Sequence, residues 1–337
     1  MAEGGEIVMN IVDGEWAECR RSGGDGAYYT LDVSGAQIAV VSTPGSRVVV
    51  ASPELVGQRY IDQVSAATRE ALGSIAWERH GVPPERPHPL VVLRGGATFS
   101  PQAALEALGH QPGAQSFITS ESHRPADGPS GATQRYAKFE EIEGVSTLLL
   151  CDIVATGGTA VAAVEKALSQ APSIRHLVVV GFVTVEGVTH LVEQLRGQLS
   201  VFIIAFEGVF RLPGTDDRSR LYTTPCDFRR SDIVCEPHLI RLLQDRPDLA
   251  IEQCVIYDGG ERAFSPEAHL RGRASYLRHM AALTQSQRWA ELRYRSGVLW
   301  DGSRVLGDPH RALIGLQRAR TAVEERFQGT TVSRPTT

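Results

Sequence analysis

Apolar residues along this 337-residue chain gather in short continuous runs separated by amphipathic segments, most regularly between residues 52 and 226. Such runs are typical of strands buried on both faces, and apolar spacings of three and four are typical of helices. Strands are predicted at residues 90–93, 148–151, 176–185 and 201–206, and helices at 60–79, 102–108, 160–170 and 188–197. This alternation predicts an α/β fold, in which helices cover both faces of a parallel sheet.

The pattern changes at both ends of this region. Short β-rich runs at 37–42 and 47–51, with Gly-rich turns, predict a small β-rich N-terminal appendage. Amphipathic stretches after residue 227 predict a mainly helical C-terminal extension. Inside the core, residues 121–134 are dense in Pro, Gly and Ser and are predicted to lack regular structure. The predicted parts are the appendage (1–51), the core (52–226) and the extension (227–337).

One stretch of the core, TLLLCDIVATGGTAV, runs from Thr147 to Val161 and combines a strand, an acid and a Gly-rich turn. The strand ends at Asp152, and the turn from Ala155 to Thr159 has no bulky side chain and opens into a helix. Backbone N–H groups of such a turn can converge on one anion at the positive end of the helix dipole. A carboxylate would repel that anion, so Asp152 is expected to face neutral hydroxyls. Together these features predict a ribose 5-phosphate site; the alternative is a plain Gly-Gly turn between a strand and a helix.

Composition narrows the class of protein. A net charge of −5 and a pI near 6.1 give no sign of a nucleic-acid or membrane surface. No apolar run approaches eighteen residues, and the first residues lack the apolar core of a signal peptide, so a cytoplasmic protein is expected. The five cysteines show no C-x-x-C pairing, which favours buried thiols over disulfides or zinc ligands.

The Asp152 segment resembles the 5-phosphoribosyl 1-pyrophosphate (PRPP) loop of the type I phosphoribosyltransferases, in which an apolar strand, an acid and A-T-G-G-[ST] follow one another. The resemblance implies a Rossmann-like core and assigns the ribose 2′ and 3′ hydroxyls to Asp152. It assigns the 5-phosphate to the turn formed by Ala155, Thr156, Gly157, Gly158 and Thr159. It also implies Mg²⁺ held through PRPP with no ligand directly from the protein, and a homodimer.

Two further segments are similar to the uracil branch of that superfamily. The run PLVVLRGG resembles a strand ending in R-A-G, which implies that Arg94, Gly95 and Gly96 grip pyrophosphate. The branch's R-[ND]-E-E-T segment is absent, and Arg124 is the nearest substitute, within a stretch where the superfamily places a mobile flap. Ile153 stands where the uracil enzymes carry proline and other members of the superfamily carry a second acid, so no second carboxylate is available there.

The predicted acceptor loop departs most from the uracil pattern, because the A-G-D of that loop is missing. Its expected acceptor contacts are Leu212, Gly214, Asp216, Asp217 and Tyr222. The departure predicts a small-molecule acceptor larger or more polar than uracil, such as a hydroxyl of an aminocyclitol antibiotic precursor. An alcohol acceptor needs a base, for which Glu186, Asp216 and Asp217 are candidates beside the donor residues Arg94 and Asp152. The alternatives are a pyrimidine base of nucleotide salvage, or a regulator that senses PRPP without turnover.

Overall fold

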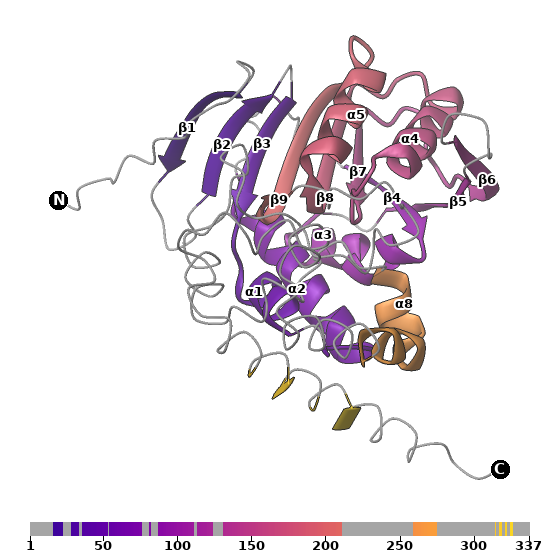
Figure 1. Ribbon diagram of the computed structural model, residues 1–337. Coiled ribbons are helices and arrows are strands. Elements are labelled where there is room, and N and C mark those ends of the chain that lie inside the picture. Colours follow the sequence, from indigo (N-terminus) through magenta and orange to yellow (C-terminus); the bar gives the residue numbers. More distant parts are fainter. Residues whose placement is uncertain are drawn as a thin grey trace.

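The computed structural model describes three long parts of the chain and several short ones (Figure 1). The described residues are 16–22, 28–33, 36–52, 54–75, 81, 87–110, 113–123, 131–210, 259–274, 314, 317–318, 321 and 324–325. All structural statements below concern these residues.

A single nine-stranded sheet organises the described chain, in the order β1-β2-β3-β9-β8-β7-β4-β5-β6. The strands are β1 (Trp16–Ser22), β2 (Tyr28–Val33), β3 (Ala36–Val41), β4 (His88–Leu93), β5 (Ser116–His123), β6 (Gly131–Lys138), β7 (Thr147–Cys151), β8 (His176–Thr184) and β9 (Ser200–Phe210). The strands from β3 to β5 in this order pair in parallel, whereas β1, β2 and β6 pair antiparallel at the two edges. The predicted α/β fold with a mostly parallel sheet is confirmed.

Helices cover both faces of this sheet (Figure 1). One face carries α4 (Gly158–Gln170) and α5 (Val185–Leu195). The other carries α1 (Pro44–Ala51), α2 (Gln58–Gly73), the 3-10 helix η2 (Gly95–Phe99), α3 (Pro101–Ala107) and α8 (Gly259–Phe264). Residues 266–274 continue as a helix after α8. No helix in the described part of the chain combines the length and the apolar character needed to span a membrane.

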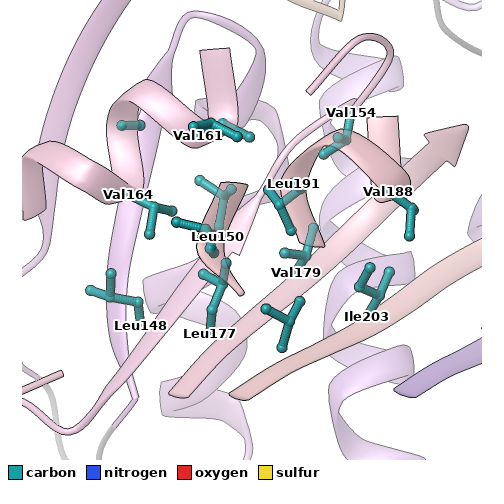
Figure 2. Packing of buried hydrophobic residues seen from close by; sticks show 14 of the residues in the cluster. Leu148, Leu150, Val154, Val161, Val164, Leu177, Val179, Val188, Leu191 and Ile203 are labelled. Carbon is teal, nitrogen blue, oxygen red and sulfur yellow. The ribbon is translucent and has the colours of Figure 1, made fainter. Parts of the chain in front are cut away.

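Alternation along the central strands divides the core into two layers. Leu148 and Leu150 of β7 face α4 and α5, whereas Leu149 and Cys151 face the opposite layer. Figure 2 shows the first layer, in which Val161 and Val164 of α4 and Val188 and Leu191 of α5 lie over Leu150, Leu177, Val179 and Ile203. Each fully buried side chain of this kind contributes about 1.5–3 kcal/mol of hydrophobic stabilisation. These layers hold the carboxyl ends of β7 and β8 in fixed relative positions.

The predicted β-rich run at 47–51 is wrong, because these residues belong to α1. Thr43 precedes the helix and its Oγ1 accepts a hydrogen bond from Ser46 N (3.0 Å), while Ser46 Oγ accepts one from Thr43 N (2.9 Å). Pro44 at the first helical position adds a third start signal. This capping box outweighs the β propensity of the valines that follow.

The prediction that 121–134 lacks regular structure is wrong at both ends of that segment. Residues up to His123 extend β5, and residues from Gly131 begin β6; the two strands pair antiparallel, with Glu121 opposite Thr133. The central strand β4 pairs with Ser116 to Thr119 of β5, and beyond Thr119 the hairpin continues through the pairing of β5 with β6. Arg124 lies outside the described residues.

The N-terminal strands join the core sheet directly. Residues Ala36 to Val41 of β3 pair in parallel with Val201 to Phe206 of β9. The contact is continuous across the boundary proposed at residue 51. The division of the chain into an appendage, a core and an extension stays a prediction.

Candidate functional site

Three neighbouring parallel strands, β4, β7 and β8, end at one edge of the sheet, and a polar residue follows each of them. Arg94 follows β4, Asp152 follows β7, and Glu186 lies in the first turn of α5 directly after β8. Ligands of open parallel sheets bind outside the carboxyl ends of the strands. This edge is therefore the candidate site.

Asp152 is half-buried and faces the turn that follows β4. Its N–H donates to Val180 O (3.1 Å), which continues the pairing of β7 with β8. A Cβ on Gly95 would lie 3.1 Å from Asp152 Oδ1, so the carboxylate and the predicted pyrophosphate turn are immediate neighbours. On the other side, Gly181 has φ +150°, and a Cβ there would lie 1.9 Å from Asp152 O. The lack of a side chain at Gly181 is what lets Asp152 take this position.

The turn from Ala155 to Thr159 leads into α4, whose N-cap residue is a glycine. Gly157 precedes the helix in the left-handed conformation (φ +79°, ψ −18°), and no side chain of this N-cap position caps the helix. The first turn of α4 holds no acidic residue. Because the first N–H groups of a helix have no intrahelical acceptor, such a start can receive an anion. The arrangement fits the phosphate role that the sequence predicts.

Thr184, a buried residue at the end of β8, holds the turn before α4 in place through hydrogen bonds. Thr184 ends β8, is fully buried, and its Oγ1 donates to Ala155 O (2.5 Å) while it accepts from Gly187 N (2.9 Å). Thr184 N also donates to Val154 O (3.1 Å). A Cβ on Gly157 would lie 2.6 Å from Gly187 O, so the turn also packs directly on the start of α5. One side chain thus caps α5 and fixes the turn.

Sequence reasoning missed Thr184. A threonine before an acid and a helical run is an N-cap signal and predicts the start of α5 at Val185, three residues before the predicted start. The second hydrogen bond, to Ala155, joins residues 29 positions apart and has no local signal.

The turn after β4 places Arg94 at the surface. Arg94 is exposed and precedes η2, and the peptide bond between Leu93 and Arg94 is cis. The hydroxyl of Thr98 donates to Gly95 O (2.8 Å) and braces the turn from inside. An exposed guanidinium at a braced turn can reach phosphate oxygens with its planar fork.

The remaining predicted residues divide into two groups. Glu186 is half-buried in the first turn of α5, where a carboxylate also stabilises the helix N-terminus. Outside the described residues lie Arg124 and the predicted acceptor contacts Leu212, Gly214, Asp216, Asp217 and Tyr222.

Burial makes Cys151, the last residue of β7, unreactive. Burial raises the pKa of the Cys151 thiol, and the neighbouring Asp152 carboxylate raises it further. Cys151 is therefore a core residue and no nucleophile. Within the described parts of the chain, no group of three or more His, Cys, Asp or Glu side chains is arranged to hold a metal ion.

Comparison with known proteins gives structural neighbours only. No family model matches the chain, and no curated protein matches it. Among solved structures, the AQ2163 protein from Aquifex aeolicus is 19% identical, covering 55% of this chain and 97% of its own, with a TM-score of 0.38. Hypoxanthine-guanine phosphoribosyl transferase of L. donovani is 20% identical, covering 55% and 96%, with a TM-score of 0.31. Hypoxanthine phosphoribosyltransferase from Trypanosoma cruzi is 22% identical, covering 55% and 95%, with a TM-score of 0.30. Similarity at this level leaves the activity to be argued from the residues of the chain itself.

Proposed function

We propose that this protein is a phosphoribosyltransferase, which transfers the 5-phosphoribosyl group of PRPP to a small acceptor and releases pyrophosphate. The observation that carries the proposal is the meeting of three groups at one sheet edge. Asp152 lies against the turn of Gly95, the Gly-rich turn that opens α4 follows it in the chain, and Arg94 precedes Gly95. A hydroxyl-binding acid between two anion-binding turns matches a sugar that carries phosphate at both ends.

The donor would lie across these groups with its 5-phosphate at the start of α4. The N–H groups of Gly158 and Thr159 would donate to this phosphate, and Thr184 would keep the turn in place. Asp152 would accept hydrogen bonds from the ribose 2′ and 3′ hydroxyls. Arg94 would bind the pyrophosphate oxygens in pairs. This orientation directs the anomeric carbon toward the acceptor.

The reaction breaks the bond between the anomeric carbon and the pyrophosphate oxygen and forms a bond to the acceptor. The protein's contribution is positioning and electrostatic stabilisation of the leaving group, with Arg94 neutralising charge that develops on pyrophosphate. Mg²⁺, when bound to PRPP oxygens, supplies further neutralisation. Mg²⁺ usually keeps several waters and binds through substrate phosphates with few protein carboxylates, so it would be held here through PRPP without a direct ligand from the protein.

The acceptor is proposed to be a hydroxyl of an aminocyclitol, by analogy with enzymes of specialised metabolism. The support is the altered acceptor loop and the surplus of acids, which attract cationic acceptors. Glu186 is the candidate base within the described residues, because it lies in the first turn of α5, the helix that packs on the phosphate turn. A pyrimidine base, as in the uracil branch, and a PRPP sensor without turnover remain the competing hypotheses.

The experiment is an assay of Mg²⁺-dependent pyrophosphate release from PRPP with neamine, 2-deoxystreptamine, uracil and cytosine as separate acceptors. Release that depends on neamine or 2-deoxystreptamine is the expected result. Release with the pyrimidines only would assign base salvage, and PRPP binding without release under all four acceptors would favour the sensor. Absence of PRPP binding would contradict the proposal as a whole. Gel filtration at several protein concentrations tests the predicted homodimer separately.

A further inference from the structure

The C-terminal segment 259–274 is fastened to the face of the sheet that carries η2, although it is remote in sequence. Figure 1 shows α8 beside α2, on the side of the sheet opposite α4 and α5. Gly57 N, before α2, donates to Arg262 O (3.0 Å), and Ala263 is buried in the same core layer as Phe99 of η2. The segment is therefore part of the body that carries the candidate site.

Arg262 is the fastening residue. Its side chain is only 3% exposed, and it donates to three backbone carbonyls near the end of α1: Leu55 O from Nε (2.7 Å), and Ser52 O (2.5 Å) and Val49 O (3.2 Å) from one terminal nitrogen. The guanidinium carbon also lies 4.6 Å from the centre of the Tyr60 ring. A cation at the C-terminal end of a helix is favoured by the helix dipole and by the free carbonyls there. These contacts fix α8 in one position.

Gly259, the first residue of α8, lies close to Ile153, the residue that follows Asp152. A Cβ on Gly259 would lie 3.2 Å from Ile153 Cδ1 and 3.0 Å from Tyr60 Oη. Ile153 is partly buried and directly follows Asp152 in the chain. The backbone of α8 therefore covers Ile153 without an intervening side chain, one residue away from Asp152.

We propose that α8 forms the acceptor-side wall of the active site and keeps water from the anomeric carbon before the acceptor enters. The proposal rests on the proposed phosphoribosyl transfer. The turn of Gly95 lies directly against the Asp152 carboxylate, and Ile153 with Gly259 offers an apolar surface one residue away in the chain. An apolar wall excludes water without competing for the ribosyl cation. Arg262 acts as a positioning residue that holds the wall.

The measurable consequence is unwanted hydrolysis. If the wall is displaced, water attacks the anomeric carbon, the bond to the pyrophosphate oxygen breaks, and the proton of the water passes to the solvent. The products are ribose 5-phosphate and pyrophosphate. This reaction needs no acceptor, so it can be measured before the natural acceptor is identified.

Gly259→Ala tests the wall, because the added Cβ would lie 3.0 Å from Tyr60 Oη and 3.2 Å from Ile153 Cδ1, so that α8 and these side chains must separate by a few tenths of an ångström. Gly272→Ala is the matched control, since Gly272 lies in the same segment with no atom within 4 Å of an added Cβ. The probe is PRPP with Mg²⁺ and no acceptor. Pyrophosphate release by Gly259→Ala is expected to rise about tenfold over wild type, which equals about 1.4 kcal/mol in activation free energy. Gly272→Ala is expected to match wild type, and the dissociation constant of PRPP is expected to stay the same in both variants.

Three further variants exclude a general loss of folding. Tyr60→Phe combined with Gly259→Ala removes the oxygen nearest to the new Cβ and is expected to bring release back toward the wild-type rate. Arg262→Lys weakens the hydrogen bonds that join α8 to the carbonyls near the end of α1 and is expected to raise release, whereas Arg271→Lys at an exposed ion pair is not. If Gly259→Ala and Arg262→Lys bind PRPP normally and release pyrophosphate at the wild-type rate, the proposed role of α8 is wrong while the proposed function stands. Failure of wild type to bind PRPP would overturn the wall together with the proposed function.

Discussion

Gly157→Ala tests whether the turn before α4 depends on close packing against α5. Two costs are expected. The residue has φ +79°, and alanine in the left-handed region costs about 1–2 kcal/mol. In addition, the new Cβ would lie 2.6 Å from Gly187 O, and overpacking of a backbone atom costs roughly 1–3 kcal/mol more. The summed loss of folding free energy is therefore about 2–5 kcal/mol.

Gly144→Ala separates these two costs. Gly144 has nearly the same backbone angle, φ +77°, but no atom lies within 4 Å of an added Cβ. It should lose only the conformational cost of about 1–2 kcal/mol. The assay is urea unfolding followed by circular dichroism, with calorimetric titration of ribose 5-phosphate. Gly157→Ala is expected to be the less stable variant and to bind at least about tenfold more weakly, a difference of 1.4 kcal/mol, while Gly144→Ala binds as wild type does. Equal stability of the two variants, or normal binding by Gly157→Ala, would refute the reasoning.

Three further predictions concern buried groups. Burial lowers the pKa of His88 to about 4 from 6.5, so the unfolded state binds the extra proton between these values and stability falls as pH drops through that window. The loss at pH 5 is about 2 kcal/mol relative to pH 8, and urea titrations of His88→Gln should show a correspondingly smaller loss. Thr184→Val leaves Ala155 O and Gly187 N without their partner and should cost about 2–4 kcal/mol by urea unfolding, whereas Thr184→Ser should restore most of it. Cys151 should resist iodoacetamide at pH 8 in the native protein and react after denaturation, and peptide mass spectrometry measures this labelling. Labelling of the native protein would contradict the burial of Cys151.

The parts of the fold that local signals dictate were predictable from the sequence. The continuous apolar run before Asp152 and the small residues after it predict β7, the turn and the start of α4, and the structure has all three. The alternation of strands and helices predicts the parallel core for the same reason, because the apolar pattern reflects burial on both faces.

The parts that depend on distant partners were not predictable. Thr184 binds a carbonyl 29 residues away, and Arg262 binds carbonyls more than 200 residues away, so neither contact leaves a local pattern. The wrong assignment at 47–51 has a different cause: the valines favour a strand, but the capping box of Thr43 and Ser46 decides the local competition. The hairpin of β5 and β6 forms despite its composition because the two strands pair with each other beyond Thr119, where the pairing of β5 with β4 ends.

The central claim is that Asp152 binds the ribose hydroxyls of a phosphorylated sugar, and a comparison of two ligands tests it most directly. Ribose 5-phosphate and 2-deoxyribose 5-phosphate are titrated calorimetrically into wild type and Asp152→Asn. Hydrogen bonds to a charged group contribute about 1.5–3 kcal/mol, so wild type should prefer ribose 5-phosphate by at least about tenfold. Asp152→Asn should lose most of that preference while it still binds the shared phosphate. Equal affinity of wild type for both sugars, or an undiminished preference in Asp152→Asn, would contradict the account.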